Sequence, residues 1–543
     1  MSTSIFRLSQ PVNEPVRDYA PGDASRAALK ARLETMARER VEIPLVIGGK
    51  EIRTGKTRKV VMPHSHGEVL AEFHLAGASE LNAAADAAQK AKAEWEALPW
   101  ERRAAIFLKA ADLLAGPWRS EINAATMLGQ SKNVYQAEID AACEFIDFLR
   151  FNAYFYQEIL SQQPLSSPGI SNCLDYRALE GFVLAITPFN FTAIAGNLPA
   201  APAMLGNTVV WKPSDTQMLS AWKTMQLFRE AGLPDGVINL VAADGPLTSQ
   251  ALLGRQDLAG IHFTGSTPTF QSLWKTVGEN ISKYRSYPRL VGETGGKDFV
   301  FAHPSADVEA LAVGLVRGAY EYQGQKCSAA SRAYIPRSLW PKVKERVLAD
   351  IATLKMGDVR DFRNFVNAVI DERSFQKISG YLEQARSASG VEVLAGGKAH
   401  GEKGYFVEPT LLQVQDPMYR TMQEEIFGPV LSVYVYDDAK IDETLAICDS
   451  TSAYALTGAI FAQDRYAVEK LMARLRNSAG NFYVNDKPTG AVVGQQPFGG
   501  GRASGTNDKA GSGLNLLRWL SPRVIKETRV PPRDYRYPFL GAE

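Results

Sequence analysis

Apolar positions along the chain follow two different periods, and the period changes near residue 180. Upstream, apolar residues recur at helical spacing over 24–38 and 137–156, and the second stretch carries one stripe through Ile139, Cys143, Ile146 and Leu149. Downstream, short apolar runs alternate with helix-like stretches of roughly ten to fifteen residues. Buried strands separated by helices are typical of a parallel, doubly wound sheet that binds a nucleotide. The runs that predict its strands are 181–187, 208–212, 237–242 and 258–263.

A second set of strand and helix patterns follows residue 293. Residues 300–322 are expected to form a loop and then a helix. The repetition predicts a second α/β domain. Its later strands are expected over 328–336 and 430–438, and its later helices over 338–354 and 466–477.

Two segments fit neither domain. Residues 173–180 alternate as a strand would, and the tail from Ser521 has no core-forming period of its own. We therefore expect this tail to pack on another element or on another subunit. The complete pattern predicts an α/β fold with two doubly wound Rossmann-type domains and a small additional element.

Length and composition restrict the class of protein. A chain of 543 residues exceeds what one compact core fills, which predicts two or three domains. Lys and Arg total 60 against 59 Asp and Glu, so no global charge favours nucleic acid or a membrane surface as a partner. The four cysteines show no CxxC spacing, which indicates a reducing compartment. Without a run of about 18 apolar residues or a secretory signal, a cytoplasmic protein is the simplest expectation.

One cysteine stands out from the other three. Cys327 lies in GQKCSAASR, where small residues on its C-terminal side leave room for a substrate. The neighbouring Lys326 is expected to lower the pKa of the thiol. Cys143 and Cys448 instead fall in helical apolar stripes, as buried structural cysteines do.

Polar residues follow several of the predicted strands. Asn190 comes just after the first run, and its amide could donate to a developing oxyanion. Glu293 ends the apolar strand of LVGETGGKDFV, at the edge of the sheet where ligands bind, although a surface turn would also explain this motif alone. Gly265 and Ser266 follow a strand and open a helix, which suits a phosphate, yet no GxGxxG follows any strand.

The histidines do not indicate a metal. His64 and His66 form a lone HxH pair in the turn-like PHSHG, with no third ligand nearby. Because a zinc site needs a fuller set, we expect both to be surface residues and expect no metal.

Seven motifs in one order carry a resemblance. TPFNF, WKPS, FTGS, ETGGK, GQKCSA, EEIFGP and QQPFGG resemble the aldehyde dehydrogenase superfamily over roughly residues 45–530. Within it the chain most resembles the members that oxidise L-glutamate γ-semialdehyde to L-glutamate, especially in LEGFVLAITPFNFTAI and NDKPTGAVVGQQPFGGGRASGTNDK. That aldehyde forms when 1-pyrroline-5-carboxylate opens in water during proline breakdown. The chain is too short to include a fused proline dehydrogenase, so the resemblance implies a monofunctional enzyme.

The resemblance implies a covalent mechanism. Cys327 would attack the aldehyde, and the Asn190 side chain and the backbone N–H of Cys327 would hold the oxyanion. Hydride loss to NAD would leave a thioester, which water activated by Glu293 would hydrolyse. Two alternatives stay open: another semialdehyde dehydrogenase, such as one for succinate semialdehyde, and a non-catalytic protein that keeps the fold.

The resemblance also implies the binding residues. The cofactor would contact Thr187, Lys212, Ser214, Asp215, Gly265, Ser266, Glu425 and Phe427. NAD is favoured over NADP because the sequence places no Arg beside Asp215 to accept a 2′-phosphate. The substrate would contact Glu144, Phe191, Lys326, Ser328, Gly490, Ala491 and Phe498. For Glu144, a solvated helix carboxylate is an equally good reading.

The implied organisation has three parts. An NAD-binding domain would comprise 1–154 and 176–291, and a catalytic domain 292–520. An oligomerisation hairpin and tail would comprise 155–175 and 521–543, so a homodimer or a larger homo-oligomer is expected. Relatives in this superfamily work in the bacterial cytoplasm and, in eukaryotes, in the mitochondrial matrix.

Overall fold

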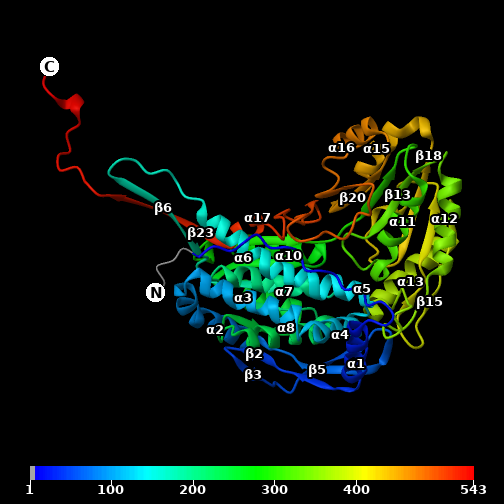
Figure 1. Cartoon of the computed structure of the whole chain (residues 1–543), viewed down its shortest axis with the longest axis horizontal. Helices are drawn as coiled ribbons and strands as arrows, with labels where there is room; N and C mark the ends of the chain where they lie inside the picture. The colour runs from blue at the N-terminus through cyan, green and yellow to red at the C-terminus, as the bar shows by residue number, and fades with distance from the viewer. Residues whose placement is uncertain (1–5) are drawn as a thin grey trace.

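The computed structural model describes residues 6–543, and two seven-stranded sheets dominate it (Figure 1). The first five residues, which belong to the predicted 1–154 segment and to the stretch searched for a secretory signal, lie outside the described residues. In the first sheet five strands are parallel, and two antiparallel strands complete one edge. Its order is β11 (Arg289–Glu293), β10 (Leu258–Thr264), β7 (Phe182–Ile186), β8 (Thr208–Lys212), β9 (Ile238–Leu240), β2 (Leu45–Ile47) and β3 (Lys50–Ile52).

The second sheet repeats this architecture. Six of its strands are parallel, and β14 is antiparallel to β17. Its order is β14 (Val391–Ala395), β17 (Thr410–Val414), β18 (Val430–Tyr436), β13 (Ala330–Pro336), β12 (Asp298–Ala302), β20 (Thr457–Phe461) and β21 (Asn481–Val484). The predicted α/β fold with two doubly wound sheets is confirmed. Strand β12 was missed, because its residues were predicted to begin a loop.

Helices cover both sheets, as the long apolar runs of the strands require. Several helices begin at side-chain caps: Ser266 caps α10, Asp371 caps α13 and Asp464 caps α16. Around the first sheet lie α1 (Ala24–Arg38), α2 (Ala78–Ala97), α3 (Trp100–Ala115), α4 (Arg119–Gln130), α6 (Phe145–Ser161), α7 (Thr192–Met204), α8 (Met218–Ala231), α9 (Gly245–Leu252) and α10 (Thr267–Glu279). Around the second lie α11 (Val308–Tyr320), α12 (Trp340–Thr353), α13 (Glu372–Ser387), α15 (Ile441–Ser450) and α16 (Arg465–Arg474).

Shorter elements connect these layers. A three-stranded sheet consists of β1 (Val41–Ile43), β5 (Ser65–His74) and β4 (Thr57–Met62). The remaining helices and strands include α5 (Val134–Ala137), α14 (Arg420–Gln423), α17 (Gly513–Leu517), β15 (Ala399–His400), β16 (Phe406–Val407), β19 (Tyr454–Ala455) and β22 (Gly501–Arg502).

A two-stranded arm projects from the body of the molecule (Figure 1). Strand β6 (Ile170–Ala178) pairs antiparallel with β23 (Leu520–Thr528) over its whole length. The prediction that the tail after Ser521 packs on another element is confirmed as far as Thr528, whereas residues 529–543 are exposed. Helix α6 continues to Ser161, so the first part of the predicted 155–175 hairpin is helical.

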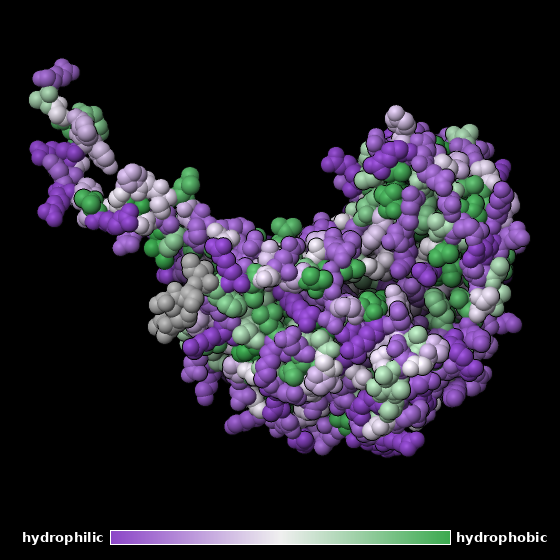
Figure 2. All heavy atoms as spheres, in the orientation of Figure 1, coloured by the Kyte–Doolittle hydropathy of each residue, from purple (hydrophilic) through white to green (hydrophobic). Residues whose placement is uncertain are grey.

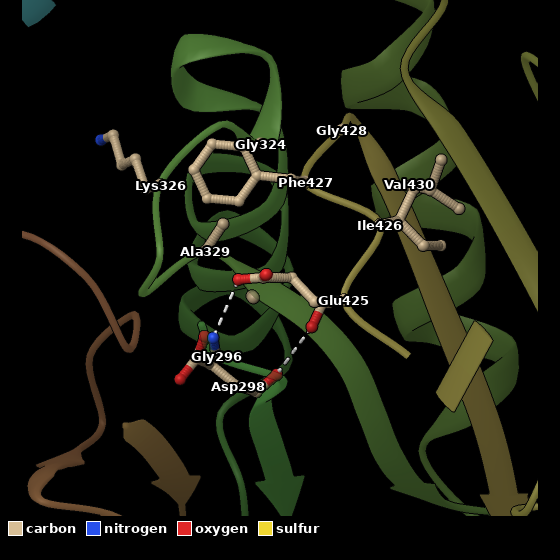
Figure 3. Close-up of a pocket in the computed structure, with 12 residues that line it drawn as sticks. Gly296, Asp298, Gly324, Lys326, Ala329, Glu425, Ile426, Phe427, Gly428 and Val430 are labelled. Carbon is tan, nitrogen blue, oxygen red and sulfur yellow. Dashed lines mark hydrogen bonds between the residues drawn. The ribbon is translucent and has the colours of Figure 1, made fainter. Parts of the chain in front are cut away.

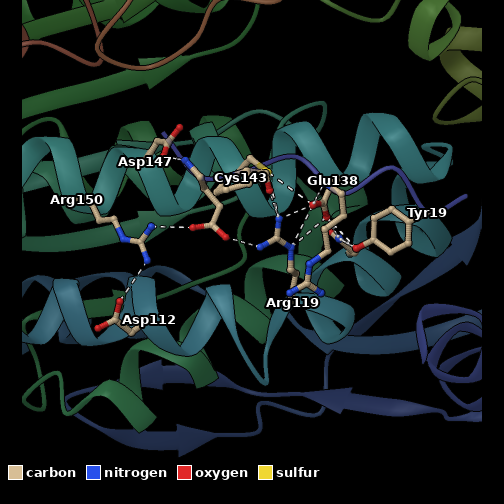
Figure 4. A network of polar contacts seen from close by, with 11 residues as sticks. Tyr19, Asp112, Arg119, Glu138, Cys143, Asp147 and Arg150 are labelled. Carbon is tan, nitrogen blue, oxygen red and sulfur yellow. Dashed lines mark hydrogen bonds and ion pairs between the residues drawn. The ribbon is translucent and has the colours of Figure 1, made fainter. Parts of the chain in front are cut away.

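A buried polar network fastens the N-terminal segment to the helices beside the first sheet (Figure 4). Arg119, at the start of α4, pairs with Glu138 and, at 2.6 Å, with Glu14. Glu138 also accepts hydrogen bonds from the Tyr19 hydroxyl at 2.9 Å and the Arg17 N–H at 3.0 Å. Glu138 opens η1 (Glu138–Glu144), a π-helical turn inside the predicted 137–156 helix. Such turns are frequent at functional sites.

Breaking this network should destabilise the fold. Arg119→Leu leaves the fully buried Glu138 carboxylate without its cation, so we expect the free energy of unfolding to fall by about 3–5 kcal/mol. Urea denaturation followed by circular dichroism measures the change. The control is Arg53→Gln, which removes exposed ion pairs to Glu42 and Glu51 and should leave the denaturation midpoint nearly unchanged. Equal denaturation midpoints for both variants would contradict a stabilising role for Arg119.

Candidate active site

One cavity of about 310 Å³ lies among residues contributed by both sheets. Most of its lining is apolar, which suits the aliphatic stem of a small ligand, and a few polar groups converge on it. The structure thus brings together predicted residues that are far apart in sequence. Of these, the cavity is lined by Cys327, Glu293, Glu144, Phe191, Lys326, Ser328, Gly490, Ala491 and Phe498.

Cys327 lies on the loop between η4 (Glu321–Gly324) and β13 and is partly exposed. Burial of the sulfur, and then the nearby carboxylates of Asp298 and Glu293, raise the pKa of the thiol well above its usual value. The prediction that Lys326 lowers this pKa is wrong, because the Lys326 ammonium pairs with Glu321 at 3.0 Å instead. The resting sulfur is therefore a neutral thiol. Cys143 and Cys448 are buried, as predicted.

Asn190 is held beside the Cys327 loop. It follows β7, is buried, and donates from Nδ2 to the backbone oxygen of Gln325 at 3.1 Å. Gln325 is two residues before Cys327, so this hydrogen bond fixes the Asn190 amide relative to the loop that carries the Cys327 sulfur. This arrangement suits a donor to an oxyanion formed at Cys327.

Glu293 is the last residue of β11 and accepts a hydrogen bond from Gly500 N–H at 3.2 Å. Burial raises the pKa of its carboxyl well above the usual value. A raised pKa makes the carboxylate a better proton acceptor at neutral pH. Its backbone oxygen also accepts from Gly265 N–H at 3.1 Å, which connects the two predicted motifs.

A cluster of two cations and one carboxylate lies at the cavity. Glu321 pairs with Lys326 at 3.0 Å and with Lys487 at 3.7 Å, so these three side chains together carry a net positive charge. Beside it, the hydroxyls of Ser328 and Thr489 are 2.7 Å apart. The sequence analysis missed Lys487 and Thr489, although both belong to NDKPTG, the motif that carried Gly490 and Ala491.

Glu144 lies in η1 and lines the cavity. Burial, and then the negative charge of Asp140, raise the pKa of Glu144 well above its usual value. The reading of Glu144 as a solvated helix carboxylate is therefore wrong. Its position suits a ligand that carries a positive charge.

A second group of predicted residues lies at the carboxyl ends of the first sheet. Thr187 follows β7 and accepts from Trp211 Nε1 at 3.0 Å, and Lys212 ends β8. Burial lowers the pKa of the Lys212 ammonium. Gly265 follows β10, and Ser266 caps α10 by accepting from Thr269 N–H. Ser214 lies beside Thr216, with 3.2 Å between their hydroxyl oxygens.

Glu425 and Phe427 come from the segment before β18 (Figure 3). The Glu425 carboxylate accepts from Gly296 N–H at 2.9 Å. A Cβ at Gly295 would lie 2.7 Å from the same carboxylate, which would have to shift, and a Cβ at Gly296 would lie 2.1 Å from the Cys327 backbone oxygen, so only glycine fits at Gly296. The Phe427 ring is 5.8 Å from that of Phe189 in an edge-on arrangement.

Two sequence-based expectations about charged and polar residues are corrected. Arg58 lies beside Asp215, with 2.6 Å between Nη1 and Oδ2, although no Arg was expected there. The expectation of a surface location is wrong for His64, which is buried with Nδ1 3.2 Å from Ser131 Oγ. His66 is partly exposed and contacts the Gly401 oxygen at 2.9 Å.

Residues 6–543 contain neither a metal-binding cluster nor a membrane-spanning helix. Among these residues, no group of three or more His, Cys, Asp or Glu is placed to hold a metal ion. Within the same range no helix combines the length and the apolar character needed to cross a membrane.

Comparisons with known proteins agree with this geometry. A model of the "Aldehyde dehydrogenase family" matches residues 51–523. A relative from Dictyostelium discoideum, "Delta-1-pyrroline-5-carboxylate dehydrogenase, mitochondrial", is 54% identical over 536 residues, which cover 98% of this chain and 96% of the relative. The human protein of the same name is 53% identical over 529 residues, with 97% and 94% covered.

A solved structure is similar over its full length. The Delta-pyrroline-5-carboxylate dehydrogenase from Mycobacterium tuberculosis bound with NAD has a TM-score of 0.96, 56% identity and complete coverage (100%) of both chains. From the family match and these identities, the chain belongs to the aldehyde dehydrogenase family, as its ordered motifs predicted.

Proposed function

We propose that this protein oxidises L-glutamate γ-semialdehyde to L-glutamate with NAD, as a monofunctional enzyme of proline breakdown. The observation that carries the proposal is the shared cavity, which combines Cys327 with the lysines of the net positive Lys326–Glu321–Lys487 cluster. The carbonyl carbon of an anionic aldehyde can react with Cys327, and its negative charge can pair with the positive cluster. The names of the relatives from Dictyostelium discoideum and human agree with this substrate.

The first chemical step forms a bond between sulfur and carbon. Cys327 loses its proton as it attacks the aldehyde carbon, and the carbonyl oxygen becomes an oxyanion in a thiohemiacetal. The Asn190 amide and the Cys327 backbone N–H donate to that oxyanion. NAD, when bound, accepts the hydride that leaves the same carbon, so a thioester remains on Cys327.

Glu293 completes the turnover. Its carboxylate takes a proton from water, whose oxygen attacks the thioester carbon, and the carbon–sulfur bond breaks to release the carboxylic acid. The raised pKa of Glu293 favours this proton acceptance, and the hydrogen bond from Gly500 N–H holds the carboxylate in place.

The residues at the first sheet fit NAD. The positive N-terminal end of α10 and the Ser266 hydroxyl suit a phosphate, and Lys212, at the end of β8, supplies a cation at the same edge of the sheet. The glycines beside Glu425 keep open the space that a side chain would fill. In this assignment Glu425 holds the nicotinamide ribose, and Phe427 packs near the nicotinamide.

The substrate contacts follow from the cavity. The backbone N–H groups of Gly490 and Ala491 and the Ser328 hydroxyl would bind the α-carboxylate, and Glu144 would meet the ammonium. Phe191 and Phe498 would flank the aliphatic stem. Succinate semialdehyde has no ammonium for Glu144, which makes it the weaker candidate.

We also propose a homodimer or a larger homo-oligomer, in the cytoplasm of a bacterium or in the mitochondrial matrix of a eukaryote. The arm supports assembly, because apolar side chains lie exposed along it and along the tail (Figure 2). The exposed residues include Val524, Ile525, Tyr535, Tyr537 and Phe539.

Loss of the nucleophile should abolish turnover. Cys327→Ala removes the sulfur that attacks the aldehyde, so NADH formation from 1-pyrroline-5-carboxylate should fall by at least about 10³-fold. Absorbance of NADH measures the rate. Cys173→Ala, which changes an exposed cysteine, should leave it unchanged. Turnover by Cys327→Ala at the wild-type rate would refute the covalent mechanism.

Removing the base should separate the two half-reactions. In Glu293→Gln the first half-reaction still runs, so rapid mixing should show about one NADH per active site followed by a rate at least about 10²-fold slower. In the wild-type enzyme kcat should fall as the pH drops below the raised pKa of Glu293, because the carboxyl is then protonated. An undiminished steady-state rate in Glu293→Gln would show that another residue is the general base.

Glu144 should govern selectivity between aldehydes. Glu144→Gln removes the partner of the substrate ammonium, so kcat/KM for glutamate semialdehyde should fall about tenfold. The value for succinate semialdehyde should change by less than about twofold. Parallel kinetics with both aldehydes test this, and equal losses for the two would make Glu144 a structural residue only.

A further inference from the structure

Arg58 connects two carboxylates at the edge of the first sheet. Its Nη1 lies 2.6 Å from Asp215 Oδ2, and its Nη2 lies 2.8 Å from Asp244 Oδ1. The two acids follow neighbouring strands: Asp215 begins η2 (Asp215–Gln217) just after β8, and Asp244 directly precedes α9 after β9. Arg58 reaches them from β4 of the separate three-stranded sheet.

This edge is where the adenosine ribose of the cofactor is expected. Ligands of open α/β sheets bind outside the carboxyl ends of the strands, and a carboxylate there accepts a hydrogen bond from the ribose 2′-hydroxyl. Asp215 and Lys212 are the residues that the family motif assigns to this place. The structure adds Arg58 and Asp244 to it.

The four charges balance one another. Two cations, Arg58 and Lys212, face two carboxylates, and both terminal nitrogens of the guanidinium are already engaged. A 2′-hydroxyl adds no charge to this cluster. A 2′-phosphate would add a charge of about −1.5 to −2 next to two carboxylates, while the Arg that could bind it is occupied.

We propose that Arg58, through its bridge to Asp215 and Asp244, determines that the protein selects NAD over NADP. The bridge holds Asp215 in place for the ribose hydroxyl and withholds the guanidinium from a phosphate. Neutralising the two acids therefore turns Arg58, with Lys212 beside it, into a 2′-phosphate site. This inference rests on the NAD-dependent function proposed above.

A purely structural role for the bridge is the competing explanation. The Arg58, Asp215 and Asp244 side chains are 44%, 32% and 50% exposed. Exposed ion pairs contribute only about 0–1 kcal/mol to folding. Variants of these residues should therefore fold, and their effects should appear in cofactor binding.

The test measures cofactor binding without any aldehyde. The full-length enzyme is titrated with NAD and with NADP, and calorimetry gives both dissociation constants. In Asp215→Asn combined with Asp244→Asn, the ratio of the NADP constant to the NAD constant should fall by about ten- to a hundredfold. High salt should weaken the gained NADP binding, because the new contacts are ionic.

Adding Arg58→Gln to that double variant tests whether Arg58 is the residue that binds the 2′-phosphate. The gain for NADP should disappear, because the residue that binds the phosphate is gone. Adding Arg53→Gln instead should leave the gain intact, since Arg53 is similarly exposed but pairs with Glu42 and Glu51. A gain that survives the loss of Arg58, or no gain at all, overturns the proposal. If these variants still oxidise glutamate semialdehyde with NAD, the proposed function stands independently.

Discussion

A strained backbone beside the nucleophile is the constraint on which the active site depends. Tyr322 and Gln323 both adopt left-handed conformations, with φ of 50° and 55°, and such residues cost of order 1–3 kcal/mol each. Hydrogen bonds from both halves of the molecule hold them. The Tyr322 hydroxyl donates to the Gln130 oxygen at 3.0 Å, and the Gln323 amide donates to the oxygens of Ser131 and Ala368 at 3.0 and 2.8 Å. Because α4 ends at Gln130, the position of Cys327 is coupled to the packing of the first sheet.

The same loop fixes the oxyanion site. Gln325 uses its backbone oxygen to accept from Asn190 and its side-chain oxygen to accept from Ile370 N–H at 2.9 Å. Asp140 holds the start of α7, two residues after Asn190, by accepting from the N–H groups of Thr192 and Ala193. The carboxylate of Asp140 pairs with the buried Lys132 at 2.6 Å. The π-helical turn that carries Asp140 also carries Glu144. A single irregular turn therefore positions the segment that follows Asn190 and also contributes Glu144 to the cavity wall.

Glu293 and Asn190 lie on the elements that the local sequence pattern predicted for them. Glu293 ends a strand, Asn190 follows one, and the edge of a parallel sheet gathers such positions, so a linear motif was sufficient. Arg58, His64 and Arg119 could not be found in this way, because their partners are far away along the chain: Asp215 is 157 residues from Arg58. Strand β12 was missed for a related reason. Its position between β13 and β20 depends on pairing that no local period records.

The electrostatics of Cys327 show why proximity in sequence misleads. Lys326 adjoins the nucleophile, yet its ammonium is committed to Glu321, while Glu293, Asp298 and Glu425 approach the sulfur through space. The thiol therefore stays protonated at rest, and a neutral thiol is a poor target for oxidants. Any process that lowers the negative charge around the sulfur favours the thiolate. Protonation of the buried Glu293 carboxyl has this effect, so the charge of the base influences the nucleophile.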